Sequence, residues 1–301
     1  MALSLRTQRR LVLLLAAGCL ACATAPRVGD EVHVAEESAI IIWDAASKTQ
    51  HFVRRASFET KAKDFGFLVP TPTVPKIEGA SEQAFVQLVR LTEPREVPRS
   101  AGAPRPAPAA APAQVVVVAT AKVAGYEAAV LKAADAGALD RWLKANGYAS
   151  SPELLDWYKP YVAQQWLITA FKISKDKPEA GRVQATAIRM SFRTEQPFFP
   201  YREPARSGPR DARPRLLRVF LLAESRYDAG IGSTKKWPGL TPWSDRIPQD
   251  ELAILIEKLE LPKGTAAKSS WLTEFEDPSS VRPGRDDLFF FPAPRQMPTH
   301  R

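Results

Sequence analysis

Apolar residues recur along most of the chain in short runs that have the length of β-strands. Residues 38–44 are β-branched and aromatic, which predicts a buried strand. Residues 48–58 predict the next strand, joined to the first by a hairpin turn, with Arg54 and Arg55 at its exposed end. Other apolar or alternating runs of strand length lie at 65–69, 114–120, 126–131, 166–173, 183–192, 216–222, 271–275 and 288–291.

Four further segments carry apolar residues at helical spacing. Phe85, Leu88 and Val89 share one helical face after Ser81, a residue type that caps helix N-termini. Another helix is predicted to begin at Ser151, and Pro160 is expected to kink or end it. The apolar residues of the helix that begins at Ser151 are Leu154, Leu155 and Tyr158. The other two helical faces comprise Leu139, Trp142 and Leu143, and Leu252, Leu255, Ile256 and Leu259.

The order of these elements predicts the fold class. Strands and helices do not alternate regularly, so the chain lacks the rhythm of a doubly wound parallel sheet. The alternating runs at 166–173 and 183–192 are separated by a polar turn, which predicts that they form a hairpin. We therefore expect an α+β fold, with a mostly antiparallel sheet and helices packed against it.

The expected domain organisation is a single body over residues 32–292. Residues 94–113 are rich in proline and alanine and cannot bury a core, so they predict a flexible loop within that body. The tail at 293–301 is expected to be disordered.

The N-terminal segment has the pattern of an export signal. Three arginines precede a short apolar stretch that is far below the ~20 residues of a spanning helix. The stretch ends in a string that is similar to a bacterial lipobox, with Cys19 as the lipid-modified residue. Residues 1–18 would then be a lipoprotein signal peptide and residues 19–31 a tether. The alternative is ordinary signal-peptidase cleavage after residues 21–23, which would give a secreted or periplasmic soluble protein.

The composition of the body excludes several kinds of reactive and binding site. The chain has 2 cysteines, Cys19 and Cys22, so the body contains no thiol nucleophile, thiolate metal ligand or disulfide. The net charge of +9 is dispersed and no nucleic-acid-binding motif is present, so nucleic acid is not an expected partner. No cofactor or metal site is predicted, because the 3 histidines do not fall in a ligand pattern. His33 lies among acids in the polar segment at residues 26–37, and His300 falls in the tail.

Acidic and aromatic residues leave two classes of function open. Serine nucleophiles lack a G-x-S-x-G turn, and only His51 could act as their base. Paired carboxylates such as Glu274, Asp286 and Asp287 could hydrolyse an envelope polymer if they converge in space. Trp237 and Trp243 lie in a segment framed by proline and glycine, and exposed tryptophans of this kind could bind a sugar ring or a partner.

Several blocks together resemble one bacterial family. Residues 64–72, residues 126–131 with 139–148, and residues 161–172 resemble, in order and spacing, blocks of a family of secreted proteins catalogued as domain of unknown function 2330. The resemblance covers roughly residues 38–245. Family members often carry cysteines just after the signal peptide, where this chain has residues 23–27 without cysteine. The resemblance implies an exported envelope protein and supplies no activity, cofactor or catalytic residue.

We therefore expect a lipid-anchored cell-envelope protein, at the outer membrane of a host with two membranes. The leading interpretation of its function is a non-catalytic binding or structural module, with an envelope protein or polysaccharide as possible partner. The alternative is the hydrolase with paired carboxylates. The sequence does not indicate an oligomeric state.

Overall fold

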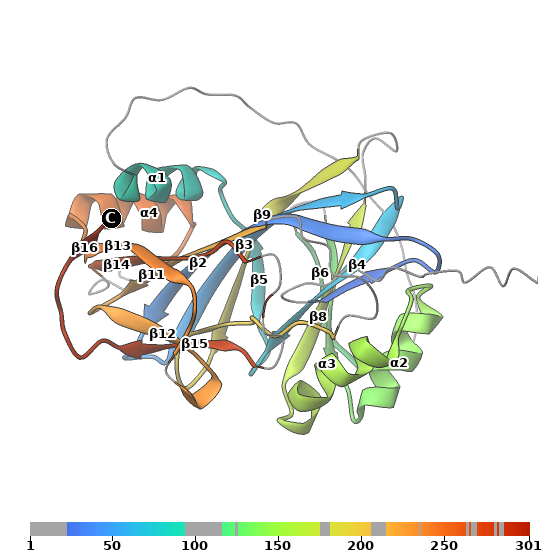
Figure 1. The fold of residues 1–301 in the computed structure, drawn as a ribbon. Helices are drawn as coiled ribbons and strands as arrows, with labels where there is room; N and C mark the ends of the chain where they lie inside the picture. Colours follow the sequence, from blue (N-terminus) through green and yellow to red (C-terminus); the bar gives the residue numbers. More distant parts are fainter. Residues whose placement is uncertain are drawn as a thin grey trace, which may run out of the picture.

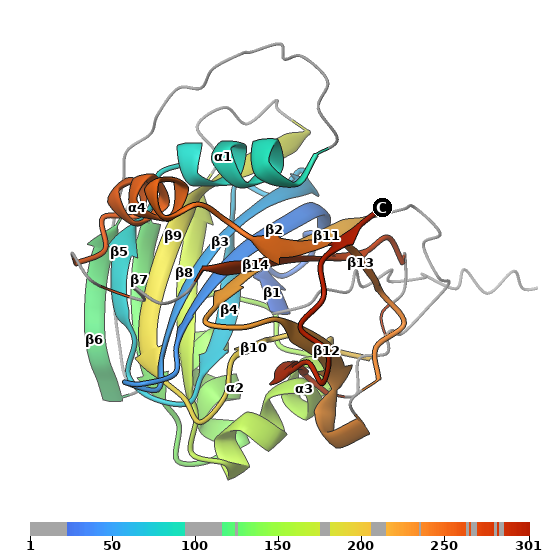
Figure 2. The ribbon, with the colours of Figure 1, turned by 90° about the vertical axis from the view of Figure 1, so that its left-hand side faces the viewer.

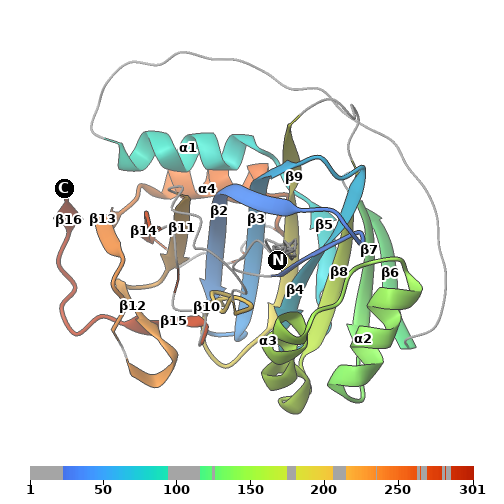
Figure 3. The ribbon, with the colours of Figure 1, turned by 45° about the vertical axis from the view of Figure 1, so that its right-hand side comes forward.

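Four layers form the body of the protein: a helix pair, a large sheet, a smaller sheet and a second helix pair (Figures 1 and 3). The structure is a computed structural model. It describes residues 23–93, 116–123, 126–174, 181–205, 215–234, 236–262, 265, 270–279, 282 and 286–301. The predicted α+β class, with mostly antiparallel sheets and helices packed against them, is confirmed. The loop predicted at 94–113 and the signal peptide with Cys19 lie outside the described residues.

The smaller sheet has five strands, all antiparallel to their neighbours. Its spatial order is β1 (Ala23–Pro26), β4 (Asp64–Thr71), β8 (Leu167–Ser174), β7 (Tyr126–Lys132) and β6 (Val116–Val123). Helices α2 (Ala136–Ala145) and α3 (Pro152–Ala163) cover its outer face.

The larger sheet has eight strands, and its spatial order mixes early and late segments of the chain. The order is β16 (Thr299–His300), β13 (Leu240–Arg246), β14 (Trp271–Asp277), β11 (Leu216–Ala223), β2 (Val32–Asp44), β3 (Thr49–Thr60), β9 (Arg182–Arg193) and β5 (Lys76–Gly79). Only the pairing of β11 with β2 is parallel among the described ladders. Helices α1 (Gln83–Thr92) and α4 (Gln249–Lys258) cover the outer face (Figure 2).

A third, small sheet closes one side of the interior. It consists of β10 (Phe198–Phe199), β15 (Leu288–Pro292) and β12 (Tyr227–Ile231), and the 3-10 helix η1 (Gly232–Thr234) follows β12. Phe198, Leu288 and Phe290 from this sheet are buried in the same apolar cluster as the inner faces of the two larger sheets.

Alternation along the strands divides the core into three clusters. On β2, Ala39 and Ile41 face the inner cluster between the sheets, whereas Ile40 and Ile42 face the cluster under α1 and α4. A third cluster fills the space between the five-stranded sheet and α2–α3. Both faces of the central strands are therefore apolar, because each sheet is covered on both sides.

N-cap side chains define where the two helices on the five-stranded sheet begin. Asp135 and Ser151 are N-caps, and their side chains accept hydrogen bonds from the backbone N–H groups of Ala138 and Leu154. Of the two effects expected of Pro160, a kink or an end of the helix, the end is wrong: α3 continues past Pro160 to Ala163. On the other side, Ser81 lies two residues before α1, and its hydroxyl accepts from the backbone N–H of Gln83.

The hairpin predicted from residues 166–173 and 183–192 is wrong. Strand β8 pairs with β4 and β7 in the smaller sheet, while β9 pairs with β3 and β5 in the larger one. The chain thus crosses from one sheet to the other between these strands. Alternating polarity reports that a strand has two different faces, but it does not say which strand lies beside it. The hairpin of β2 and β3 does form, over a ladder from Val32 to Asp44.

The ends of the body also differ from expectation. The predicted tether includes residues 23–26, yet these residues form β1, in which Ala23 and Ala25 are fully buried against β4 and the α2–α3 layer. The expected disordered tail contains β16, which pairs with β13. Both strands are short and carry few apolar atoms, so neither has a recognisable strand pattern. Within the described residues, no helix combines the length and apolar character needed to cross a membrane.

Gly66 on β4 sets how closely β1 can approach, and this gives a first prediction. A Cβ atom at Gly66 would lie 3.2 Å from Cβ and 3.3 Å from the carbonyl oxygen of Ala25. We expect Gly66→Ala to lower the free energy of unfolding by about 1–3 kcal/mol, because β1 must shift. Gly181→Ala is the control, since nothing lies within 4 Å of that position. Urea unfolding of both variants checks this, and equal stability would contradict the close packing of β1.

Candidate functional site

Trp243 lies on the outer face of the larger sheet, beside the C-terminal strand. Register places His300, Trp243 and Glu274 in one row across β16, β13 and β14. The indole ring of Trp243 stacks on the imidazole of His300, with centroids 5.5 Å apart and an interplanar angle of 22°. His300 Nε2 also lies 3.0 Å from Asp245 Oδ2. Trp243 is therefore half-buried, with one ring face covered by the C-terminal strand.

Trp237 lies on the other side of the same sheet. Its ring packs on the inner apolar cluster, edge-on to Tyr201 and Phe275 at centroid distances of 6.5 and 6.0 Å. The ring also closes over Gly239, where an added Cβ would fall 2.2 Å from it. The two tryptophans predicted to form one binding loop thus face opposite sides of the sheet. They do not make a common surface.

Two carboxylates are brought together on the outer face, and an arginine binds both. Glu274 and Glu276 project from the same side of β14, and Arg218 of β11 faces them. Arg218 Nε lies 2.9 Å from Glu274 Oε1, and Arg218 Nη2 lies 2.8 Å from Glu276 Oε1. Burial raises the pKa of Glu274, and a hydrogen bond from Thr92 opposes this shift.

Asp286 and Asp287 lie on the inner side, close to α3. Asp287 is buried, and Oδ1 accepts hydrogen bonds from the Tyr161 hydroxyl at 2.8 Å and from the backbone N–H of Arg202 at 3.1 Å. Burial raises the pKa of Asp287 to about 6. Asp286 is half-exposed and lies 3.5 Å from Arg202 Nη2. The structure therefore separates Glu274 from Asp286 and Asp287 by the thickness of the larger sheet.

A network of buried ion pairs, absent from the sequence-based expectations, links β2, β3 and β14. Register puts Glu37 of β2 and Asp277 of β14 on either side of Leu217, all facing inward. Arg282 lies between the acids: Nε is 3.3 Å from Asp277 Oδ2, and Nη1 is 3.4 Å from Glu37 Oε2. Arg54 of β3 donates from Nε to Glu37 at 2.7 Å.

The network continues away from the sheet. Arg282 Nη1 lies 3.6 Å from Glu203 Oε1, and Arg215 donates a hydrogen bond to the same carboxylate. The Tyr201 hydroxyl donates to Asp277 at 2.7 Å. Burial raises the pKa of Glu203 and opposes its ionisation, while the neighbouring arginines favour the charged form. We name the six charged side chains the buried ionic cluster: Glu37, Arg54, Glu203, Arg215, Asp277 and Arg282.

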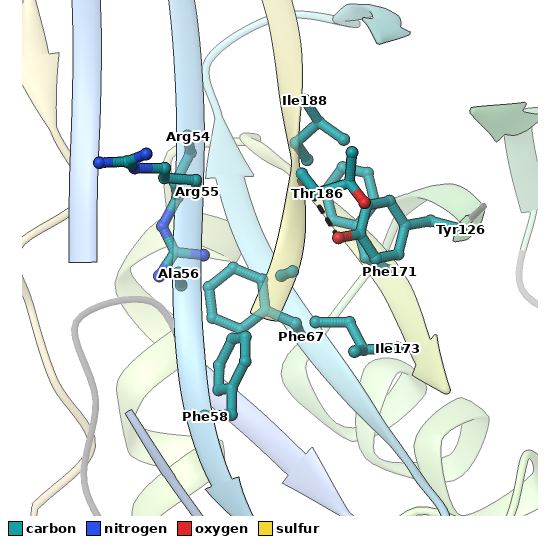
Figure 4. A pocket seen from close by; sticks show the side chains of 11 residues that line it. Arg54, Arg55, Ala56, Phe58, Phe67, Tyr126, Phe171, Ile173, Thr186 and Ile188 are labelled. Carbon is teal, nitrogen blue, oxygen red and sulfur yellow. Dashed lines mark hydrogen bonds between the residues drawn. The ribbon is translucent and has the colours of Figure 1, made fainter. Parts of the chain in front are cut away.

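One member of the buried ionic cluster, Arg54, borders a small cavity between the two sheets (Figure 4). Its volume is ≈ 20 Å³, enough for one water molecule. Phe58, Phe67 and Phe171 line it together with Arg54, whose guanidinium lies 3.8 Å above the Phe67 ring. Tyr126 donates from its hydroxyl to the carbonyl of Thr186, shown by the dashed line in Figure 4. The cavity is too small for an organic ligand.

The histidines of the larger sheet have structural partners. His51 pairs directly across from Ser191, with Nδ1 2.9 Å from the serine hydroxyl oxygen. Burial, with the charge of Arg189, lowers the pKa of His51 to about 4, so the ring is neutral at physiological pH. His33, in the segment expected to be polar and without regular structure, lies on β2, with Nε2 3.7 Å from Glu31 Oε2. Among the described residues, no group of three or more potential ligands could hold a metal ion.

Comparison with known proteins decides the family. The model of a family described as an uncharacterized protein conserved in bacteria (DUF2330) matches residues 15–256, which is most of the chain. The chain belongs to this family. No curated protein matches it. Among solved structures, the crystal structure of baculovirus P35 is similar over 88% of this chain and 98% of that chain, at 7% identity and a TM-score of 0.38. A likeness this weak carries no argument about function.

Membership of the DUF2330 family confirms the resemblance found in the sequence blocks, and the structure shows why those blocks stand out. The first block forms β4, which lies between β1 and β8 in the smaller sheet, and the others form β7, most of α2, the end of α3 and β8. The buried ionic cluster was not foreseen. Arg54 was placed at an exposed strand end, but only 5% of it is accessible. The sequence contains one indication of this burial: Arg54 is a charged residue beside the apolar centre of its strand.

The contact between His300 and Trp243 yields a second prediction. We expect His300→Ala to uncover the Trp243 ring, which will red-shift its emission and increase its quenching by acrylamide. His33→Ala is the matched control, because His33 lies on β2, which is separated from β13 by two other strands of the sheet. The shift should vanish in a Trp243→Phe background. Identical spectra for His300→Ala and the parent would contradict a covering role for the C-terminal strand.

Proposed function

We propose that this member of the DUF2330 family is an exported, lipid-anchored cell-envelope protein whose body is a non-catalytic binding or structural module. Its membrane contact would be a diacylglycerol chain on Cys19, after removal of residues 1–18. A single acyl chain gives only reversible membrane attachment, whereas the two acyl chains of a diacylglycerol group anchor a protein stably. In a host with two membranes, we favour the outer membrane.

The observation that carries the non-catalytic proposal is the arrangement of the acids. Glu274 and Glu276 share Arg218 on the outer face, whereas Asp286 and Asp287 bind Arg202 and Tyr161 on the inner side. A glycosidase mechanism needs two carboxyl groups that face a common substrate, about 5–10 Å apart. Glu274 and Glu276 are both bound to the Arg218 guanidinium, and the buried Asp287 is bound to the Tyr161 hydroxyl, so protein groups occupy the positions where a substrate would contact these acids. The geometry gives the paired-carboxylate hydrolase no support, and we do not propose it.

The partner surface that fits best is the edge of β13 around Trp243. Here an aromatic ring, Glu274 and Asp245 lie next to the last strand of the sheet. An envelope protein or polysaccharide could contact this edge once the C-terminal strand moves, because His300 otherwise covers the ring. Trp237 is a poorer candidate, since its partly buried ring packs against the inner cluster.

Membrane fractionation of cells that express Cys19→Ala tests the anchor. We expect the wild-type chain in the membrane fraction and Cys19→Ala in the soluble fraction or in the uncleaved precursor. Cys22→Ala is the matched control, three residues further along, and should fractionate as wild type. Equal membrane partitioning of Cys19→Ala and wild type, with cleavage near residue 23, would contradict the lipid anchor.

A further inference from the structure

The edge of the larger sheet at β13 offers more backbone than its last strand covers (Figure 3). Among the described residues, β13 pairs with β14 at five positions, whereas β16 pairs with it at two, Trp243 and Ser244. The ladder with β16 stops at Thr299 because the preceding residue is Pro298, which has no N–H group to donate. At the start of β13, Leu240 is 47% exposed. A longer strand therefore has room to pair along this edge.

The segment that carries β16 is held to the body by few contacts. Of residues 293–301, only the first is buried. Gln296 accepts a hydrogen bond from the backbone N–H of Arg226 at 2.6 Å and donates one to its carbonyl at 3.2 Å. His300 adds its ion pair with Asp245, whose partners are 57% and 31% exposed. Exposed polar contacts stabilise a fold weakly, and a segment with little buried apolar surface opens locally at low cost.

The outward side chains of β13 define what an incoming strand should carry. Leu240, Trp243 and Asp245 share the outer face, since cross-strand partners on β14 lie on the same side. Arg246, the one basic residue of β13, lies on the opposite face. In β16, the imidazole of His300 stacks on the indole ring and contacts the carboxylate. A guanidinium suits this position better, because it is always charged, stacks on aromatic faces and binds carboxylates with a planar fork.

We propose that β13 accepts an extended, arginine-bearing segment of an envelope protein as its outer strand, in place of β16. This inference rests on the proposed binding function of the edge and names the chemistry of the partner. The segment would run antiparallel to β13, as β16 does, with its arginine over Trp243 and beside Asp245. Main-chain hydrogen bonds along the edge supply affinity, and the arginine supplies specificity. A strand fits better than a sugar polymer, because it pairs with the main-chain groups of the edge.

Peptide binding to the full-length protein, extracted from membranes in detergent, tests the inference. The probe is a capped, fluorescein-labelled heptapeptide, Thr-Val-Thr-Arg-Thr-Val-Thr, which places the arginine and both valines on one face of a strand. We expect saturable binding by fluorescence anisotropy, and binding about fivefold weaker when glutamine replaces the arginine. His300→Ala should bind the probe about tenfold more tightly, because β16 then competes less well for the edge.

Two substitutions of exposed carboxylates test the specificity. Asp245→Asn should lose most of the preference for arginine over glutamine. Glu36→Gln is the matched control and should keep it, because Glu36 is an exposed acid on β2, elsewhere in the same sheet. An equal preference in Asp245→Asn and Glu36→Gln would contradict the contact between the arginine and Asp245.

Amide hydrogen exchange in the bound peptide separates strand addition from simple ionic attraction. An added edge strand is protected at every second amide, those that face β13. Binding without alternating protection would overturn the inference, as would no binding to the parent and to His300→Ala when both show native circular dichroism. Binding of soluble peptidoglycan fragments instead, lost in Trp243→Ala, would overturn the strand partner and leave the edge as the binding surface. Failure of both ligands would overturn that surface as well.

Discussion

Arg282→Ala is expected to destabilise the body by about 3–5 kcal/mol, the cost typical of removing one partner from a buried charge pair. Arg282 is 1% exposed and contacts three acids: Glu37, Glu203 and Asp277. Without the guanidinium, these carboxylates remain buried with less positive charge to balance them. The acids come from strands and connections that are far apart in sequence, so the loss would loosen the junction of β2, β11 and β14.

Urea unfolding followed by circular dichroism measures this effect. The control is Arg182→Ala, because the side chains of Arg182 and its partner Glu36 are 54% and 67% exposed. A surface pair of this kind contributes about 0–1 kcal/mol. If Arg282→Ala cost no more than Arg182→Ala, the buried ionic cluster would not hold these strands together. Should Arg282→Ala fail to fold, Arg54→Met tests the edge of the same cluster at lower expected cost.

Asp287→Asn is expected to change how the stability of the protein depends on pH. Burial raises the pKa of Asp287 from 3.8 to about 6 in the folded state. The folded protein therefore binds more protons than the unfolded chain between these pH values, and stability falls as pH rises through this window. A shift of about 2 units corresponds to about 3 kcal/mol. Asparagine stays neutral and retains an oxygen that accepts from Tyr161.

The comparison needs stability curves of both proteins at pH 4 and pH 8. We expect the stability of Asp287→Asn relative to wild type to rise by about 3 kcal/mol between these two values. Asp286→Asn is the neighbouring control: its carboxylate is 47% exposed, so its relative stability should vary much less. A constant difference between Asp287→Asn and wild type would show that Asp287 is not strained by burial.

Local sequence patterns predicted the strands and helices well because burial imposes a period on them. β2 and β11 read as strands because their side chains are buried on both faces of the larger sheet. Helix α3 read as a helix because Ser151 and Pro152 form a cap and a first turn. The hairpin of β8 and β9 failed because pairing depends on which sheet each strand joins, and no local pattern encodes that choice.

The ends of the body could not be predicted for a different reason. β1 is built from alanine, threonine and proline, and Ala23 and Ala25 are buried because Gly66 lets them approach β4. Small residues carry no strand signal on their own. Their position is set by a partner more than 40 residues away in the sequence. The same holds for β16, which is defined by its contact with Trp243 and Asp245.

The candidate site was partly visible in the sequence. The chemistry of Trp243 and of Glu274 marks each as a candidate, but no local pattern indicates that they lie in one row of a sheet. Arg218, which binds Glu274 and Glu276, was not selected, because an arginine in a strand has no special pattern. The buried ionic cluster assembles from six distant positions, and its pairs exist only once the strands are in register.

The mass of the mature N-terminal peptide tests the central claim most directly. Protein extracted from membranes with detergent and digested with protease should yield a peptide that begins at Cys19 and carries the mass of a diacylglycerol group. The account predicts that this modified peptide replaces the unmodified one in wild type and is absent in Cys19→Ala. A mature protein that begins after residue 23, without an acyl group, would contradict it.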